Sequence, residues 1–237
     1  LIAVVSGSLS LGTATVANTG GTVQINSGAT LHLNTASITS GSVVNAGTVD
    51  TTGSSGLHGV SVTNTHLLEV LSGTLTLDAS TSVNNAGGTI QIDGGAVLDL
   101  NNASISSGVL ANNGTVTFSG TSDLHNVAVI NHHLLEVVSG TLVLDANTSI
   151  NNAGGTIQID SGAGLDLNTI TIISGNLVNH GTIHTTGADA LHAVTVTNTG
   201  LIEVLSGTLT LDTGTSVANG GGIVQVDSGA TLNLDTA

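Results

Sequence analysis

The chain lacks every permanently cationic side chain and every cysteine. Its 237 residues include no Lys, Arg, Pro, Cys, Met, Trp or Tyr, and 15 Asp and Glu give a formal net charge of −15. Without Lys or Arg nothing neutralises phosphate, which excludes nucleic-acid binding and basic docking on anionic membranes. Without Cys there are no disulfides, thiol nucleophiles or thiolate metal sites. No apolar run approaches the roughly 18 residues of a membrane span, so we expect no membrane insertion.

Glycine and β-branched residues are abundant instead, and they are arranged in short alternating runs. Residues 89–92 read Thr-Ile-Gln-Ile, a Gly pair follows at 94–95, and residues 98–100 read Leu-Asp-Leu. Alternation with a period of two, interrupted by Gly and Asn, is typical of short strands joined by tight turns. Disordered linkers are poor in β-branched residues, so the abundance of Val, Ile and Thr favours a folded, all-β chain.

A 67-residue unit repeats along the whole chain. The tetrapeptide Leu-Leu-Glu-Val at 67–70 returns at 134–137 and, as Leu-Ile-Glu-Val, at 201–204. Such self-similarity is the signature of a repeat architecture, and we predict one solenoid domain spanning 1–237. Its copies cover approximately 1–66, 67–133, 134–200 and, incompletely, 201–237.

A shorter pattern, apolar-x-Asn-x-Gly, recurs inside this unit, and its Asn positions follow one another at intervals of 27, 19 and 21. We predict that each recurrence is one coil of a parallel β-solenoid with three short strands per coil. This gives about 10 to 11 coils of 19–27 residues, and three coils per 67-residue repeat. Stacked amides donate and accept along the coils, so we expect the Asn residues to form a hydrogen-bonded ladder. Its predicted members are Asn18, Asn45, Asn64, Asn85, Asn112, Asn131, Asn152, Asn179, Asn198 and Asn219.

The coils with the longest Asn interval contain additional residues at 34–38, 101–105 and 168–172. We expect a fourth short strand or a bulge there, on one face of every third coil. Segments that leave a solenoid often carry binding, but these are small and weakly polar, which favours a role in spacing or packing.

The plan Gly-Thr-Ile-x-Ile, Ser-Gly-x-x-Leu-x-Leu and Val-x-Asn-x-Gly resembles the β-helical repeats of large Gram-negative surface proteins. These include filamentous-haemagglutinin-like proteins, autotransporter passengers and giant repetitive adhesins, and the resemblance covers the whole chain. It implies a right-handed β-helix, secretion to the cell surface, and roles in adhesion or biofilm formation. The resemblance is specific for architecture rather than for activity, because such repeats serve as stalks beneath varied binding modules.

Outward positions on stacked strands form rows, and reading these rows across the predicted coils brings carboxylates next to imidazoles. In this register Asp99 lies beside His125, and Asp166 lies beside His192. Such pairs are either acid–base pairs, in which a carboxylate orients an imidazole, or an exposed polar ladder in which opposite charges attract weakly. No nucleophile or oxyanion donor recurs with them, which favours the ladder.

Other chemical sites have weaker support. His132 and His133 lie close in sequence to Glu136 and could bind a transition metal, but solvated turn residues are the simpler interpretation. Asp93 and Asp99, candidate carboxylates for glycan hydrolysis, recur in the next repeat as scaffold residues would. The acidic residues are dispersed rather than gathered into calcium-binding cages. We therefore expect no enzymatic activity, no cofactor and no metal site, with at most weak binding of divalent cations.

The predicted function is structural. We expect a secreted, cell-surface segment that serves as the stalk or filament of a large adhesin-like protein. Both ends of the sequence fall inside the repeat, so we expect association with flanking repeats or with further copies, end to end or laterally. The alternative is a β-helix module that binds glycans or another surface through the face bearing the additional residues. Ice binding is a third interpretation, weakened because Thr rows do not persist from coil to coil.

Overall fold

The computed structural model describes residues 1–145 and 147–235, which form 35 β-strands. The strands fall into two compact units, Leu1–Val116 and Thr117–Ala237, and β18 (Thr115–Ser119) spans their boundary. The described residues contain no helix, and hence no helical segment long and apolar enough to cross a membrane. Val, Ile and Thr suit these strands because branched side chains pack well on a pleated surface.

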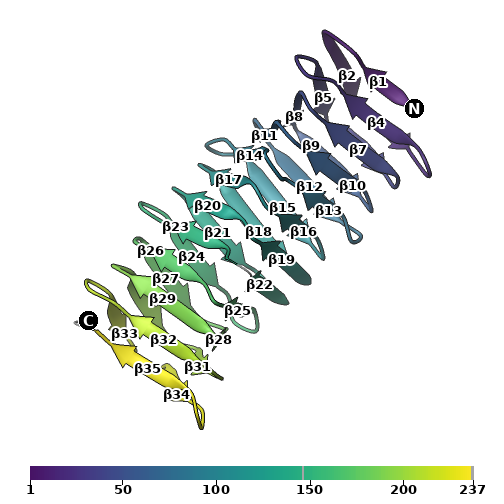
Figure 1. Cartoon of the computed structure of the whole chain (residues 1–237). Coiled ribbons are helices and arrows are strands. Elements are labelled where there is room, and N and C mark those ends of the chain that lie inside the picture. The colour runs from purple at the N-terminus through teal and green to yellow at the C-terminus, as the bar shows by residue number, and fades with distance from the viewer. Residues whose placement is uncertain (146, 236–237) are drawn as a thin grey trace. The chain divides into compact units, whose positions relative to one another are not determined.

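The unit Leu1–Val116 is a parallel β-solenoid in which successive strands alternate among three sheets. Each strand pairs with the strand three places further along the chain, so three strands complete one coil (Figure 1). The first sheet contains β1 (Ile2–Val4), β4 (Thr22–Ile25), β7 (Ser42–Asn45), β10 (Ser61–Asn64), β13 (Ser82–Asn84) and β16 (Ser104–Ser106). The second contains β2 (Ser8–Gly12), β5 (Thr30–Asn34), β8 (Thr48–Thr52), β11 (Leu67–Val70), β14 (Thr89–Ile92) and β17 (Val109–Asn112). The third contains β3 (Thr15–Ala17), β6 (Ser37–Thr39), β9 (Ser54–His58), β12 (Thr74–Asp78) and β15 (Val97–Asn101).

The unit Thr117–Ala237 has the same architecture and the same three-strand coil. Its first sheet contains β19 (Thr121–His125), β22 (Thr141–Asp145), β25 (Gly164–Asn168), β28 (Thr182–Thr186), β31 (Leu201–Val204) and β34 (Ile223–Val226). Its second contains β20 (Ala128–Asn131), β23 (Ser149–Asn151), β26 (Thr171–Ile173), β29 (Ala188–His192), β32 (Thr208–Leu211) and β35 (Thr231–Leu234). Its third contains β21 (Leu134–Val137), β24 (Thr156–Ile159), β27 (Asn176–Asn179), β30 (Thr195–Asn198) and β33 (Ser216–Ala218).

The core of each unit is a column of inward aliphatic side chains. In the paired strands β12 and β15, Leu75, Leu77, Leu98 and Leu100 are fully buried, whereas the residues between them face outward. Successive side chains of a strand point to opposite sides, so each strand gives the core its alternate residues. No coil could bury this row alone, and the stability of the fold therefore comes from the stacking of neighbouring coils.

The predicted three-stranded parallel coil is confirmed, but the coil is shorter and more regular than the Asn spacing suggested. Paired residues lie 18 to 23 positions apart, as in Leu31 with Val49 and Leu75 with Leu98. At three strands per coil, the 35 strands make about 12 coils rather than 10 to 11. The longest predicted coils, such as the one drawn from Asn18 to Asn45, are wrong.

The 67-residue repeat is not a whole number of coils. Equivalent positions in successive repeats lie ten strands apart, as in β4 and β14 or in β21 and β31. With three strands per coil, ten strands make three coils and one further strand, so the next repeat begins on the next sheet. Accordingly β4 belongs to the first sheet of its unit and β14 to the second. The predicted superrepeat of three whole coils is wrong for this reason.

The fourth strand expected in every third coil does not occur. The additional residues contribute to β6, β16 and β26, which are regular members of the three sheets. Within the first unit β6 lies in the third sheet and β16 in the first, so the additional residues do not share one face. The single face predicted to carry all of them is therefore not formed within this unit.

Thr51 and Thr185 each place a hydroxyl group in the core without a recorded hydrogen-bond partner. They occupy equivalent repeat positions, each is 1 % exposed, and neither Oγ1 has a hydrogen-bond partner among the described residues. Changing Thr185 to Val keeps the side-chain shape and removes an unpaired polar group. We expect a gain of about 1 kcal/mol in the free energy of unfolding, measured by urea denaturation.

Thr81→Val is the matched control for this change. Thr81 is equally buried, but its Oγ1 donates toward Leu57 O at 2.8 Å and accepts from Val60 N at 3.1 Å. The same substitution should therefore destabilise the fold at Thr81. A loss of stability in both variants would show that the Thr185 hydroxyl is satisfied.

Candidate functional site

The Asn residues form hydrogen-bonded stacks at the corners of the coils, as predicted. Asn45 Nδ2 donates to Asn64 Oδ1 at 2.7 Å, and Asn64 Nδ2 donates to Asn85 Oδ1 at 2.6 Å. Equivalent bonds of 2.6 or 2.7 Å in the second unit join Asn131 to Asn152, Asn179 to Asn198, and Asn198 to Asn219. Each amide uses its carbonyl as acceptor and its NH₂ as donor, which is how stacked amides satisfy one another away from water.

These stacks are short runs, interrupted wherever the interval between successive Asn residues is longest. Asn85 Nδ2 donates to Val109 O at 3.1 Å, and Asn152 Nδ2 donates to Asn176 O at 3.0 Å. The longest interval exceeds one coil, so it carries the next Asn to another corner. Asn85 follows β13 of the first sheet, whereas Asn112 ends β17 of the second. One run therefore ends on a backbone carbonyl and the next begins on a different edge.

The Asn amides also fasten the corners to the backbone. Asn45 Oδ1 accepts from Gly47 N at 3.1 Å, and its Nδ2 also donates to Leu67 O at 2.8 Å. Leu67 opens the strand that follows the next corner of the stack, so one side chain ties two successive coils together. With 1 % exposure for Asn45 and none for Asn64, no external ligand reaches these amides. Their geometry supports a structural role.

Imidazoles pair with carboxylates, but not with the predicted partners. His192 Nδ1 lies 3.0 Å from Asp212 Oδ2, whereas Asp166 Oδ1 lies 2.9 Å from His184 Nδ1. The predicted pairing of Asp166 with His192 is wrong because it assumed a coil that was too long. Strand pairing instead places His184, which comes earlier in the chain, directly opposite Asp166.

His125 likewise takes a different partner from Asp99, the carboxylate predicted for it. Its Nδ1 lies 2.6 Å from Asp145 Oδ1, the residue directly opposite in the paired strand β22. His58 with Asp78 repeats the same arrangement at 2.6 Å in the preceding repeat. Close to half of the His125 side chain is exposed, and such solvated pairs contribute little to stability. Asp123 lies near the His125–Asp145 pair, and burial and the charge of Asp145 raise its pKa, while the charge of His125 lowers it. The exposure of these pairs favours a role as cross-strand contacts.

Gln side chains bridge six further carboxylates, two at each of three positions. Gln91 Nε2 donates to Glu69 Oε1 at 2.7 Å and to Asp93 Oδ1 at 2.9 Å. Burial raises the pKa of Glu69, and the nearby negative charges of Asp93 and Asp50 raise it further. The same bridge recurs at Gln158 and at Gln225. The same bridge at three equivalent positions is what a scaffold feature would show, and Asp93 accepts its hydrogen bond from Gln91.

The residues considered for a transition metal contact other groups. His132 Nδ1 lies 3.1 Å from Ala153 O, and Glu136 Oε1 accepts from Gln158. Burial and the charge of Asp160 raise the pKa of Glu136. Within residues 1–145 and 147–235, no three His, Asp or Glu side chains are placed together to hold a metal ion.

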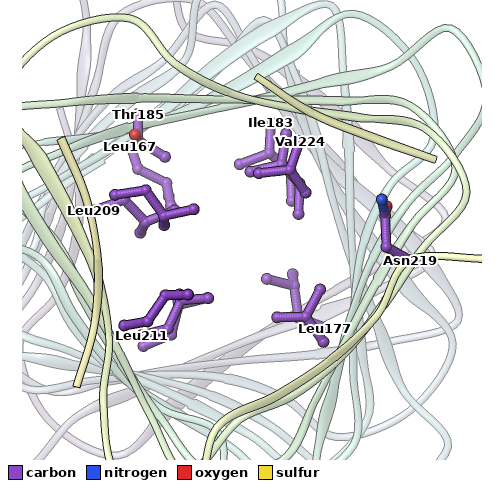
Figure 2. Close-up of a pocket in the computed structure, with 13 residues that line it drawn as sticks. Leu167, Leu177, Ile183, Thr185, Leu209, Leu211, Asn219 and Val224 are labelled. Carbon is purple, nitrogen blue, oxygen red and sulfur yellow. The ribbon is translucent and has the colours of Figure 1, made fainter. Parts of the chain in front are cut away.

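An apolar hollow of about 270 Å³ lies at the last coil of the second unit. Figure 2 shows its labelled aliphatic side chains around an open centre, with Asn219 at one margin. The hollow is the end of the core column: Leu209 and Leu211 form its buried wall, while Val224 and Leu234 on the last strands are 36 % and 63 % exposed. Reading the sequence as rows of outward residues could not reveal it, because all these residues point inward.

Asp189 is a buried carboxyl that the outward rows also missed. It is 2 % exposed, its Oδ1 accepts from Ile170 N at 2.8 Å, and its Oδ2 has no hydrogen-bond partner among the described residues. Burial raises its pKa to about 6, although the Ile170 amide that bonds to Oδ1 and the nearby backbone of Thr186 and Thr169 act in the opposite direction. The sequence could have indicated it, because Asp189 lies at an inward-facing position of its strand and replaces Ser122 of the preceding repeat.

Comparisons with protein-family models, with curated proteins and with solved structures return no match to this chain.

Proposed function

We propose that the chain is a structural segment, a stalk or filament module, of a secreted cell-surface protein. The observation that supports this is how its polar side chains are used. The buried Asn amides, the His–carboxylate pairs and the Gln bridges each bond to a neighbouring coil. A catalytic or ligand-binding role requires such groups to converge on a shared space instead. In this chain these polar side chains instead connect each coil to the next.

Surface location, adhesion and biofilm formation enter this proposal through the resemblance to β-helical repeats of Gram-negative surface proteins. The composition is compatible with such a location. A chain with no Lys or Arg offers no cleavage site to trypsin-like proteases, and its net charge of −15 keeps copies apart in solution.

The partner we propose for the hollow is a further coil of the same kind, either from a flanking repeat of the same protein or from the first coil of a second copy. The last coil leaves uncovered one inward residue in β33, two in β34 and two in β35, namely Val217, Val224, Val226, Leu232 and Leu234. The first coil offers the same numbers from β3, β1 and β2, namely Val16, Ile2, Val4, Leu9 and Leu11. Among the described residues no strand pairs with the outer edge of either coil, and a free strand edge favours further pairing. Heterologous contact of this kind builds filaments.

Leu234→Asp tests this stacking because it puts a charge into the hollow at a residue that is already 63 % exposed. We expect the mean mass of the unmodified chain, measured by light scattering, to rise with concentration and that of Leu234→Asp to stay monomeric. Asn233→Asp adds the same charge on the outward side of the same strand and should associate normally. A monomeric unmodified chain at all concentrations would rule out end-to-end stacking.

A further inference from the structure

The corner between β28 and β29 buries a carboxyl group where the other two repeats bury a hydroxyl group. Ser55, Ser122 and Asp189 occupy equivalent positions in three successive repeats. All three side chains are buried, at 4 %, 0 % and 2 % exposure. The corner therefore has the same architecture each time, and only the group inside it changes.

The serine version of the corner is fully bonded. Ser55 Oγ accepts from Ala36 N at 3.3 Å and can donate to Leu33 O or Thr52 O, each 3.1 Å away. Ser122 Oγ donates in the same way to Ser119 O at 3.1 Å. The corner thus requires a group that accepts from one backbone amide and donates to a backbone carbonyl.

Asp189 can accept a hydrogen bond from the backbone amide in either protonation state. It can donate one to a backbone carbonyl only when it is neutral. Its Oδ1 accepts from Ile170 N, the equivalent of Ala36 N, at 2.8 Å. Its buried Oδ2 finds no hydrogen-bond partner among the described residues. A protonated carboxyl can donate from this oxygen as a serine does, whereas a carboxylate has no proton to give.

No positive charge in the surroundings compensates an ionised Asp189. The strands that pair with β29, namely β26 and β32, contain no titratable residue. In β28 and β25 the titratable groups are His184 and Asp166, which point outward and pair with each other, and His184 Nε2 also lies 3.4 Å from Glu203 Oε2 on β31. His192, at the end of β29, pairs with Asp212. Each nearby imidazole therefore already has its own carboxylate.

We propose that this corner is a pH-dependent lock, closed when Asp189 carries a proton and loosened when Asp189 is ionised. This inference goes beyond the structural role proposed above and does not depend on it. Burial raises the pKa of Asp189 to about 6 in the folded chain, against about 3.9 for an unfolded Asp. Below pH ~4 both states hold the proton and the corner is unaffected. As the pH rises from ~4 to ~6, the closed corner progressively loses the stability that protonated Asp189 gives it. Above pH ~6 this contribution is completely lost. A pKa difference of this size corresponds to about a 100-fold change in the closed-to-open equilibrium.

Amide hydrogen exchange at Ile170 in the full chain tests the lock, because that N–H is bonded to the carboxyl itself. We compare the unmodified chain with Asp189→Ser, which restores the group found in the other repeats. The ratio of the two exchange rates removes the intrinsic pH dependence of exchange. We expect a ratio near one at pH 4 and faster exchange in the unmodified chain at pH 7, by up to about 100-fold. An equal ratio at both pH values would overturn the proposal.

Two further variants separate ionisation from altered packing. Asp189→Asn has nearly the same shape but is always neutral and can donate, so it should stay protected at pH 7. Ser55→Asp should transfer the pH dependence to the amide of Ala36, in the other unit. The lock does not exist if the exchange rate of Ala36 in Ser55→Asp, divided by that in the unmodified chain, is the same at both pH values. It also does not exist if Asp189→Asn opens like the unmodified chain. Ser55→Asp decides the question even if Asp189→Ser fails to fold.

Discussion

Replacing Asn64 by Ala is expected to destabilise the fold by about 3 kcal/mol. Asn64 is the middle member of its run, accepting from Asn45 and donating to Asn85 and to Thr89 O. The substitution leaves a donor on one side and acceptors on the other without partners in a site that water does not reach. Each buried polar group that loses its partner costs about 1–3 kcal/mol. Urea denaturation followed by circular dichroism measures the loss.

Asn84→Ala is the control, because the neighbouring Asn84 side chain is exposed and its recorded hydrogen bond among the described residues is from Ala86 N. We expect a loss below about 1 kcal/mol there. Asn64→Asp makes a sharper test, since it keeps the shape but turns the donor toward Asn85 Oδ1 into an acceptor. It should be at least as destabilising as Asn64→Ala at neutral pH. If Asn64→Ala and Asn84→Ala cost the same, the Asn runs do not stabilise the coils.

The fold class could be read from the sequence because alternation and corner residues are local properties. Ile90 and Ile92 alternate with polar residues whatever the coil length, and an Asn–Gly corner is recognisable in isolation. Coil length is not local. It depends on which residues lie side by side, and the Asn spacing identifies equivalent corners without saying on which edge they lie. Asn85 and Asn112 illustrate the error, since they look like successive corners of one stack but end strands of different sheets.

The predicted Asp–His pairs depended on the coil length, so the error in coil length also produced the wrong pairs. With the longer coil that the sequence suggested, Asp166 faces His192, whereas with the observed pairing it faces His184. The chemistry of the row was therefore recognised correctly as carboxylate beside imidazole, while the identities of the partners were not. Asp189 was missed for another reason. A single Ser-to-Asp difference between repeats looks like variation on the surface until the inward direction of that side chain is known.

Replacing Gly175 by Ala is expected to cause a large loss of stability, although the substitution removes no hydrogen-bonding side chain. Gly175 lies at φ +71°, where an L side chain is strained, and an added Cβ would collide with the backbone O and the Nδ2 of Asn152. Gly41 and Gly108 meet Asn18 and Asn85 in the same way, so the stacks that end at Asn18, Asn85 and Asn152 each end against a glycine. Gly175→Ala must therefore displace the Asn152 corner as well as adopt the strained backbone. We expect a loss of about 3–5 kcal/mol, most of it from the collision.

Gly154→Ala separates the two contributions, because Gly154 also has a positive φ, of +83°, but an added Cβ would meet nothing within 4 Å. It should cost only the backbone term of about 1–2 kcal/mol. Thermal and urea denaturation of both variants give the comparison, and amide exchange of the Asn152 corner localises it. A loss at Gly175 no larger than that at Gly154 would mean that the corner relaxes freely. In that case the close contact with Asn152 would not be the reason that position 175 requires glycine.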